Sequence, residues 1–423
     1  MHIVVIGNGI AGTNAARFIR KNSQHTITMV SNETLQPFAR TALMYVYMGH
    51  MRHEDTHLYE DWFWKKNKID RIEAQVINLD TQSQTLLLAD GQTICYDKLI
   101  IASGSKPNKT NIENENIKGV SGLYHLQDLK KIEQYTQNIG QAVVVGGGLI
   151  GIELAEMLRS RHIHTTLLVR ESSFWNNVLP AQESQMINQH IIEHHIDLRL
   201  NTQLKAIVAH ENNTLKSIIT HTNEEIPCCF LGISIGVSPN IDFLKNSGLL
   251  TNKGILVDEY LQTNAPNVFA IGDCAERQNP QTGRKPIEAL WYTARMMGQT
   301  VAQTIANKKT AYDAGMWFNS AKFLDIEYQV YGQINAKKTE GIEEIFWQHE
   351  SKKKSVRIAF DASTQAVVGF NLMGIRYRHE VCEQWILDKT PIKTVVNQLE
   401  KANFDPEFFK TYEKQIAQQF YNL

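Results

Sequence analysis

Two segments of this chain carry the same glycine spacing in the same surroundings, and this duplication constrains the fold more than any other feature. In the first segment a short apolar run of strand type (residues 2–6) leads into three glycines in GxGxxG spacing. A stretch of helix-forming composition (11–22) and a β-rich run (26–30) follow. The glycines are Gly7, Gly9 and Gly12. The order predicts a strand, a tight turn, a helix and a second strand.

The second segment repeats this order 139 residues later, again as a predicted strand, turn, helix and strand. A strand is predicted over residues 142–145, a helix follows to about Arg161, and a further strand covers 165–169. The glycines of this copy are Gly146, Gly148 and Gly151. A single GxGxxG is weak evidence, but two copies in this context indicate two dinucleotide sites rather than two ordinary turns.

Each glycine of such a loop has a physical task. The first permits the turn, the second lets the backbone approach a pyrophosphate, and the third lets the helix pack close to the strand. The free N–H groups and partial positive charge of the helix N-terminus then favour the phosphates. The residues that begin the two helices complete the predicted contacts: Ile10 and Ala11 in the first copy, Leu149 and Ile150 in the second.

The residue after the second strand of each copy is expected to recognise the ribose of the dinucleotide. An acidic side chain at this place hydrogen-bonds the ribose hydroxyls. Glu33 is the acid at this place in the first copy, and Asn32 is the alternative hydrogen-bonding residue. In the second copy the residue is Arg170, which can accept the 2′-phosphate of NADP, although Glu171 stands beside it. The interpretation of Arg170 as a solvated surface residue fits equally well, so the choice between NADH and NADPH stays open.

Composition narrows the class of protein. The chain has 423 residues, enough for two or three domains, and a net charge of −1, which attracts neither nucleic acid nor an acidic membrane. We find no apolar run of about 20 residues and no leader pattern, and therefore expect a cytoplasmic protein without membrane association. The five cysteines are odd in number and include no CxxC, which argues against both a disulfide scaffold and a dithiol centre.

Three further segments make a resemblance specific. Residues 96–108 (YDKLIIASGSKPN) lie between the two loops, and residues 232–240 (GISIGVSPN) and 263–276 (TNAPNVFAIGDCAE) follow the second. The chain resembles the pyridine nucleotide-disulfide oxidoreductase superfamily, well over about residues 1–310 and weakly beyond. It is most similar to the branch of rubredoxin, ferredoxin and nitrite reductase flavoproteins. Disulfide reductases carry a redox cysteine pair soon after the first strand–helix–strand segment, and this chain has no cysteine there.

The resemblance implies FAD at the first loop and NAD(P)H at the second. It also implies further contacts: Asp273 with the ribityl chain of the flavin, Arg40 over the FAD, Val76 with the adenine, and Glu288 with the nicotinamide. Trp291 is expected either to cover the flavin or to be a half-buried helix residue. The remaining residues that we assign to cofactor binding on this basis are Ala102, Ser103, Gly104, Gly236, Gly272 and Ala289.

One departure from the family pattern falls at the predicted catalytic centre. Tyr45 stands where the branch has a lysine that pairs with a glutamate, and the matching glutamate is present as Glu153. A tyrosine can donate one hydrogen bond to a carboxylate but supplies no fixed charge. We therefore expect Tyr45 to hydrogen-bond Glu153 or the flavin edge, with aromatic packing as the alternative.

The predicted fold class is α/β, with two Rossmann-like domains and a smaller α+β domain. Residues 1–110 and 235–310 are assigned to the FAD domain, 111–234 to the NAD(P) domain, and 311–423 to a C-terminal domain for the acceptor or for a homodimer contact. No metal site is predicted, because His50, His53 and His57 fit no helical face well and are interpreted as surface histidines.

The resemblance implies an FAD-dependent oxidoreductase that takes hydride from NAD(P)H and passes electrons to a small carrier protein such as rubredoxin or ferredoxin. Two alternatives stay open at this point. One is an NAD(P)H oxidase or diaphorase with a small-molecule acceptor. The other is a flavin-bound protein that responds to NAD(P)H as a sensor or binding module.

Overall fold

The computed structural model describes residues 1–408 and 410–422. The chain divides into two compact units, each built from separate stretches of sequence. The first unit consists of residues 1–109, 122–134 and 236–314, and the second of 110–121, 135–235 and 315–423. We describe each unit by itself.

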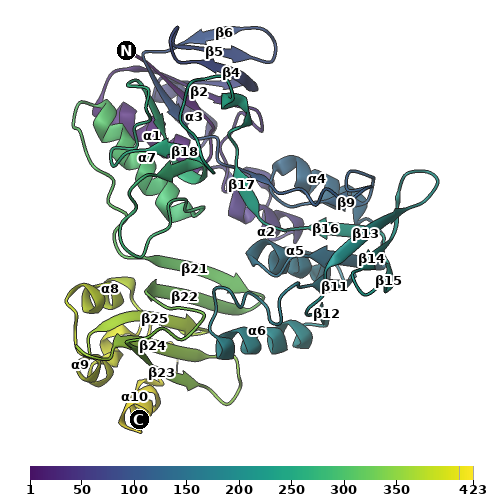
Figure 1. Ribbon diagram of the computed structural model, residues 1–423, viewed down its shortest axis with the longest axis vertical. Coiled ribbons are helices and arrows are strands. Elements are labelled where there is room, and N and C mark those ends of the chain that lie inside the picture. The colour runs from purple at the N-terminus through teal and green to yellow at the C-terminus, as the bar shows by residue number, and fades with distance from the viewer. Residues whose placement is uncertain (409, 423) are drawn as a thin grey trace. The chain divides into compact units, whose positions relative to one another are not determined.

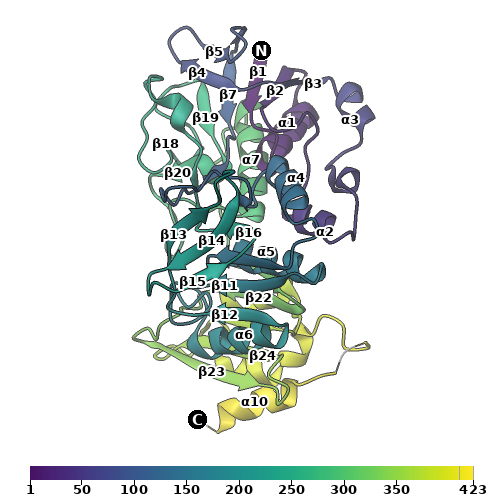
Figure 2. The same ribbon diagram turned by 90° about the vertical axis from the view of Figure 1, so that its right-hand side faces the viewer.

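The first unit, which contains α1 and α7 in Figure 1, has a five-stranded sheet at its centre, whose strands are labelled in Figure 2. All four strand pairings in it are parallel, and the order is β19-β7-β1-β2-β3. The strands are β1 (His2–Ile6), β2 (Thr26–Ser31), β3 (Ile69–Glu73), β7 (Lys98–Ile101) and β19 (Val268–Ala270). Residues 3–6 are buried, as expected for a parallel strand covered on both faces.

Two helices of the first unit pack closely against one another. They are α1 (Ile10–Asn22) and α7 (Trp291–Ile305). Their contact is tight because α7 carries Gly298 there: a Cβ at Gly298 would lie 2.5 Å from the carbonyl oxygen of Ala11. The other helices are α2 (Leu43–Tyr47), α3 (Asp61–Lys66) and α4 (Leu126–Tyr135), the last ending one residue beyond this unit.

Smaller sheets complete the first unit. An antiparallel meander comprises β4 (Val76–Asp80), β5 (Thr85–Leu88) and β6 (Thr93–Cys95). Its last turn contains Asp90 and Gly91, where the sequence predicts a hairpin turn. Two short pairs are β8 (Ser105–Pro107) with β17 (Val237–Pro239), and β18 (Ile255–Val257) with β20 (Ala275–Arg277).

The second unit contains another parallel five-stranded sheet, in the order β12-β11-β10-β16-β9. Its strands are β9 (Val120–Ser121), β10 (Gln141–Val145), β11 (His164–Leu168), β12 (Ile196–Arg199) and β16 (Phe230–Ile233), with helices α5 (Leu149–Ser160) and α6 (Ala181–Glu193). Figure 2 shows most clearly the antiparallel meander β13 (Leu204–Ala209), β14 (Leu215–Thr220) and β15 (Glu225–Pro227). Two parallel sheets with helices confirm the predicted pair of Rossmann-like folds.

An antiparallel sheet in the order β21-β22-β25-β24-β23 occupies the C-terminal part of the second unit. Its strands are β21 (Phe318–Phe323), β22 (Ile326–Gly332), β23 (Ile342–Gln348), β24 (Ser355–Asp361) and β25 (Val367–Met373). The helices are α8 (His379–Leu387), α9 (Ile392–Asn397) and α10 (Glu413–Tyr421). Strands and helices that share one core confirm the predicted α+β character.

The division into units differs from the three predicted domains in two respects. Residues 122–134 group with the first unit, where the Leu126 N–H donates to the Glu33 carboxylate at 2.8 Å. Residues 315–423 group with the nucleotide-binding sheet of the second unit. A buried ion pair between Arg357 of β24 and Glu183 of α6 joins these two parts.

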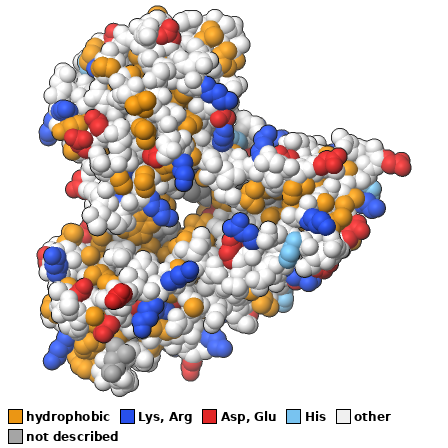
Figure 3. Space-filling model, in the orientation of Figure 1, with side chains coloured by type: hydrophobic (Ala, Val, Ile, Leu, Met, Phe, Trp, Pro, Cys, Tyr) orange, Lys and Arg blue, Asp and Glu red, His pale blue; other side chains and the backbone are white. Residues whose placement is uncertain are grey.

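The helices and the surface charges can be compared with the prediction that the protein binds neither membranes nor nucleic acid. In the part of the chain that the structure describes, no helix has both the length and the apolar character that crossing a membrane requires. Figure 3 shows Lys and Arg interspersed with Asp and Glu on the face in view, in keeping with the net charge of −1.

Candidate functional site

The first glycine loop lies between β1 and α1, and its geometry explains two of the three glycines. Gly7 has φ +98°, and a Cβ there would lie 2.1 Å from the carbonyl oxygen of Ala102. A Cβ at Gly12 would lie 2.0 Å from the carbonyl oxygen of Gly7. No larger residue fits either position, because backbone atoms block both.

The second loop, between β10 and α5, reproduces this arrangement. Gly146 has φ +128°, and its Cβ would lie 2.2 Å from the carbonyl oxygen of Ser234. A Cβ at Gly151 would lie 2.0 Å from the carbonyl oxygen of Gly146. The two loops thus share a backbone geometry and not merely a spacing of glycines.

The middle glycine of each loop differs from its neighbours. Among the described residues, no heavy atom lies within 4 Å of a Cβ built on Gly9 or on Gly148. Each of these glycines is the N-cap of its helix, α1 or α5, and makes no side-chain capping hydrogen bond there. Open space beside uncapped N–H groups is what a pyrophosphate bound against the backbone requires, so both loops fit the predicted dinucleotides. Ile10 and Ala11 of α1, and Leu149 and Ile150 of α5, begin the helices at these loops.

The end of β2 brings Glu33 next to Arg40. Arg40 donates two hydrogen bonds to the Glu33 carboxylate, at 3.0 and 2.5 Å, and its guanidinium lies 4.5 Å from the ring centroid of Tyr124. Burial opposes ionisation of Glu33, yet hydrogen bonds from His125 and Arg40 lower its pKa to about 2. A ribose bound here would share the Glu33 carboxylate with Arg40. Asn32, the alternative ribose contact, is exposed.

A partly buried carboxylate follows β19. Asp273 accepts a hydrogen bond from the Ser105 hydroxyl at 3.0 Å, and burial raises its pKa. The preceding Gly272 has φ +72°, and its Cβ would lie 3.1 Å from the Cβ of Ala11 in α1. The fold therefore places Asp273 at the first glycine loop, as its predicted contact with FAD requires.

The segment after β7 lies at the same loop. The carbonyl of Ala102 covers Gly7, and the Ser103 hydroxyl donates to the carbonyl of Asn240 at 2.7 Å. Gly104 has φ +67° and accepts a hydrogen bond from the Asn240 N–H at 2.9 Å. Ser103 and Gly104 therefore anchor this segment to the chain near β17.

Glu288 has partners that the sequence did not suggest. Its side chain is buried, and Arg284 donates two hydrogen bonds to the carboxylate, both at 2.7 Å. Arg277 lies 3.3 Å from the same carboxylate. The predicted contact of Glu288 with a nicotinamide would have to compete with two buried guanidinium groups of the first unit.

The other predicted residues of the first unit are dispersed. Trp291 is half-buried at the start of α7, with the Arg295 guanidinium 5.7 Å from its ring centroid, and Ala289 just before it is exposed. Val76 is buried at the start of β4. Gly236, predicted to bind a cofactor, is exposed beside β17 and accepts a hydrogen bond from the Asn108 N–H at 3.0 Å.

Tyr45 and Glu153 fall in different units. Tyr45 is partly buried in α2 of the first unit, with the His50 ring 6.0 Å away between ring centroids. Glu153 lies on α5 of the second unit, where burial raises its pKa to about 7 and Glu156 adds to the increase. The predicted hydrogen bond between Tyr45 and Glu153 stays a prediction.

Arg170 lies on the surface of the second unit just after β11. Its guanidinium is 72% exposed and donates to the Glu171 carboxylate at 2.8 Å. The exposed pair is compatible with either nucleotide, because Glu171 neutralises the charge that a 2′-phosphate would use.

The five cysteines are free, and three of them, Cys228, Cys274 and Cys382, are buried. Cys274, beside Asp273, is buried, and its thiol donates to the carbonyls of Ile101 and Ile271; burial raises its pKa. Burial likewise raises the pKa of Cys228 to about 12. A thiol kept protonated in this way is a poor nucleophile.

The sequence did not identify Ser105 and Tyr124, which contact Asp273 and Arg40. Tyr124 lies in the segment that was assigned to the other domain, and a lone serine or tyrosine carries no motif. Both residues meet their partners only through the tertiary fold.

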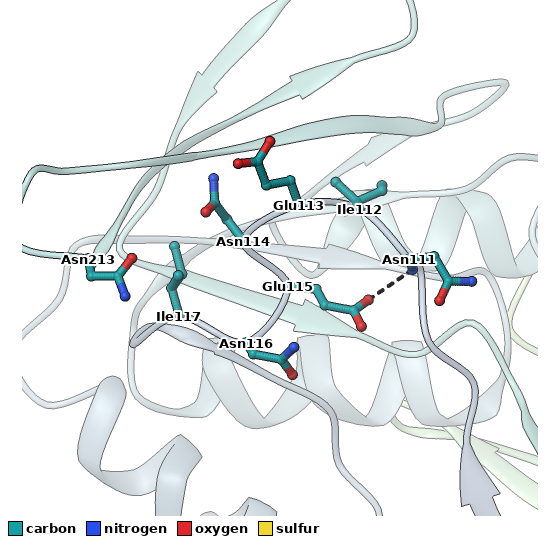
Figure 4. Close-up of a pocket in the computed structure, with 8 residues that line it drawn as sticks. All are labelled: Asn111, Ile112, Glu113, Asn114, Glu115, Asn116, Ile117 and Asn213. Atoms are coloured by element: carbon teal, nitrogen blue, oxygen red, sulfur yellow. Dashed lines mark hydrogen bonds between the residues drawn. The ribbon is translucent and has the colours of Figure 1, made fainter.

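A hollow in the second unit lies apart from the residues predicted to bind cofactors. Figure 4 shows its lining, which consists of residues 111–117 and Asn213. The Glu115 carboxylate there accepts hydrogen bonds from the Thr110 and Asn111 N–H groups, at 2.9 and 3.0 Å. Glu115 therefore holds its own loop together.

The chain is similar to known proteins over most of its length. The family described as "Pyridine nucleotide-disulphide oxidoreductase" matches residues 1–298. A rubredoxin-NAD(+) reductase of Pseudomonas putida is 25% identical over 313 residues, 73% of this chain and 81% of its own length. An NADH oxidase of Methanocaldococcus jannaschii is 26% identical over 338 residues, 77% of this chain and 75% of its own length.

A solved structure, the covalent complex of putidaredoxin reductase with putidaredoxin, has the same fold. Its TM-score is 0.84 at 21% identity, and the match covers 99% of this chain and 98% of that one.

Proposed function

Since the chain belongs to the pyridine nucleotide-disulphide oxidoreductase family, we propose that it takes hydride from NAD(P)H and passes electrons to a small iron-containing carrier protein, of the rubredoxin or ferredoxin kind. Family membership confirms the prediction of an FAD-dependent oxidoreductase that uses NAD(P)H. The observation that carries the choice of acceptor is the similarity to a rubredoxin-NAD(+) reductase over 81% of that protein's length.

Cysteine placement supports the same choice. No cysteine precedes Cys95, so the stretch after the first glycine unit has no redox thiol. Cys274, the cysteine beside the proposed flavin site, is buried, and burial raises its pKa. Electrons therefore have no dithiol to pass through on the way to an acceptor, which favours a partner that docks at the flavin itself.

The chain's own residues would bind and orient the two nucleotides. The first loop and Asp273 would hold FAD, and the second loop would hold NAD(P)H, each with its pyrophosphate on backbone N–H groups of α1 or α5. When bound, FAD supplies the chemistry of accepting a hydride and releasing electrons singly. Arg40 would fix Glu33 beside the first loop, because the two already form an ion pair.

The test is to mix the FAD-loaded protein with NADH or NADPH without oxygen and to follow the flavin spectrum. We expect rapid bleaching, and then rapid recovery of the oxidised spectrum when an oxidised rubredoxin or ferredoxin is added. Failure of both nucleotides to bleach the flavin would overturn the proposal. Bleaching without faster recovery on adding a carrier would overturn the acceptor alone.

Tyr45 has a proposed role at the flavin edge or beside Glu153, because a lysine occupies its place in the branch that the sequence resembles. Tyr45→Phe removes only the hydroxyl. We expect slower bleaching by NAD(P)H with unchanged FAD content. An unchanged rate would leave Tyr45 as a packing residue.

A second candidate function is oxidation of NAD(P)H with a small acceptor. The similarity to an NADH oxidase over 75% of that protein's length favours it. The same experiment separates the two candidates, since an oxidase recovers its oxidised spectrum rapidly with oxygen alone.

Two further expectations stay predictions. One is that the C-terminal part of the chain is a docking or homodimer surface, and the other is a cytoplasmic location.

A further inference from the structure

Two histidines and an aspartate outside the glycine loops meet in the second unit. His190 and His194 are four residues apart at the C-terminal end of α6, which places both rings on one face of the helix. Asp325 stands in the turn between β21 and β22. One ligand atom from each residue lies within 4.8 Å of the other two.

The hydrogen bond of His194 determines which ring nitrogen faces Asp325. His194 Nδ1 lies 2.9 Å from the carbonyl oxygen of His190, so in the neutral ring Nδ1 carries the proton and donates it. Nε2 then presents its lone pair to Asp325 Oδ1, which is 3.5 Å away. Two lone pairs at this distance repel one another unless a proton or a metal cation lies between them.

His190 provides the third donor atom. Its side chain is 1% exposed, and its Nε2 contacts Asp325 Oδ1. Within residues 1–408 and 410–422, His190 Nδ1 has no hydrogen-bond partner, and Glu193 Oε2 lies 3.9 Å from it. Lys353 lies 3.6 Å from Glu193 and adds a positive charge nearby.

We propose that His190, His194 and Asp325 form a binding site for a divalent transition-metal ion of the zinc type. Two imidazoles and one carboxylate suit Zn²⁺, whereas Ca²⁺ and Mg²⁺ prefer oxygen ligands alone. Ligand atoms bonded to Zn²⁺ at about 2.0–2.2 Å in a tetrahedron are roughly 3.3–3.6 Å apart. The 3.5 Å between His194 Nε2 and Asp325 Oδ1 matches that separation, whereas His190 Nε2 and Asp325 Oδ1 are closer together and would have to move apart to admit the ion.

Three protein ligands leave a fourth position for water or an added group. The site connects α6, beside the nucleotide-binding sheet, to the β21–β22 hairpin of the C-terminal sheet. A bound ion would therefore clamp two parts of the second unit, and its free energy of binding would stabilise their packing. The proposal does not depend on which electron acceptor the protein uses.

The experiment is a zinc titration of the FAD-loaded, chelator-treated full-length protein in competition with a chromogenic zinc indicator. We expect one site per chain with a Kd of about 1 µM or tighter. Asp325→Asn and His194→Gln should each weaken it on the order of tenfold or more. Both residues lie at least partly in solvent, so neither variant should unfold the protein.

The matched control is His195→Asn, at the exposed next residue, whose φ of +58° asparagine tolerates. It should bind zinc as the unchanged protein does. In thermal unfolding, zinc should raise the midpoint of the unchanged protein and of His195→Asn but not that of Asp325→Asn. A Kd weaker than about 100 µM, or equal weakening by His195→Asn, would overturn the proposal.

Discussion

At the scale of single residues, the middle glycines of the two loops offer a way to separate folding from nucleotide binding. A methyl group at Gly9 or Gly148 meets no protein atom, because the described structure leaves that space open. We expect Gly9→Ala to keep the unfolding midpoint of the apoprotein but to lose FAD on purification. Gly148→Ala should retain FAD and weaken NAD(P)H binding on the order of tenfold or more, measured by equilibrium titration.

The control for both variants is Gly140→Ala, which also points into open space but lies outside either loop. It should leave both affinities unchanged. If Gly9→Ala held FAD as firmly as Gly140→Ala does, the assignment of the first loop to the pyrophosphate would be wrong.

The raised pKa of Glu153 predicts that the stability of the folded chain depends on pH. Burial raises its pKa from an ordinary value of 4.5 to about 7, so the folded chain holds this proton more tightly than the unfolded chain. The contribution to stability is full below pH 4.5 and is lost as the pH rises through about 7. Glu153→Gln has no such proton and should therefore gain stability relative to the unchanged protein as the pH rises.

We expect the difference in unfolding midpoint to grow by at least about 2–4 °C between roughly pH 5 and pH 8, the shift that about 1 kcal/mol gives in a unit of this size. Differential scanning calorimetry without nicotinamide nucleotide measures it. The exposed Glu211→Gln in the same unit is the control. A difference that stays constant with pH would contradict the raised pKa.

At the scale of elements, the Arg357–Glu183 pair holds β24 against α6. The side chains are 5% and 0% exposed, and Arg357 donates two hydrogen bonds to the carboxylate, both at 2.8 Å. Arg357→Met should destabilise the second unit by about 3–5 kcal/mol, because it leaves a buried carboxylate without its partner. Urea denaturation followed by circular dichroism measures the loss.

An exposed pair in the same unit serves as the control. Arg376 and Glu327 are 48% and 44% exposed, so Arg376→Met should cost about 0–1 kcal/mol. Adding Glu183→Leu to Arg357→Met should recover part of the loss, since no unpaired charge is then buried. Equal effects of the two arginine variants would contradict the importance of burial at β24.

The sequence predicted elements more reliably than contacts between them. The strand at residues 2–6 was predicted with the bounds of β1, because a parallel strand is an apolar run, and the second-copy strands were predicted to within a residue. The Ser105–Asp273 hydrogen bond and the Arg357–Glu183 pair were not predictable. Each joins residues more than 160 positions apart, and packing alone brings them together.

The glycine loops were also predictable because backbone sterics require glycine at fixed places. Glu288 shows the limit of such reasoning. A motif position indicated a ligand contact, but Arg284 and Arg277 compete for the same carboxylate. The metal-ligand cluster escaped detection for a similar reason, since Asp325 is more than 130 residues from His190 in sequence.

At the scale of the whole molecule, the two nucleotide loops lie in different units, and each ligand should therefore stabilise its own unit. A ligand at about 100 times its Kd adds about 2.7 kcal/mol to the unit that binds it. We expect calorimetry to show two transitions. FAD should raise the one that belongs to the first unit, and NAD⁺ or NADP⁺ the one that belongs to the second.

The variants assign the transitions. Arg357→Met should lower only the transition that the nicotinamide nucleotide raises, because Arg357 and the second glycine loop share a unit. Gly148→Ala should abolish the nucleotide-dependent rise while leaving the FAD-dependent one. If instead FAD and the nicotinamide nucleotide raised one common transition, and Arg357→Met lowered that same transition, the two units would unfold as one. Each nucleotide would then stabilise the site of the other, because any ligand that binds only the folded chain would oppose its unfolding everywhere.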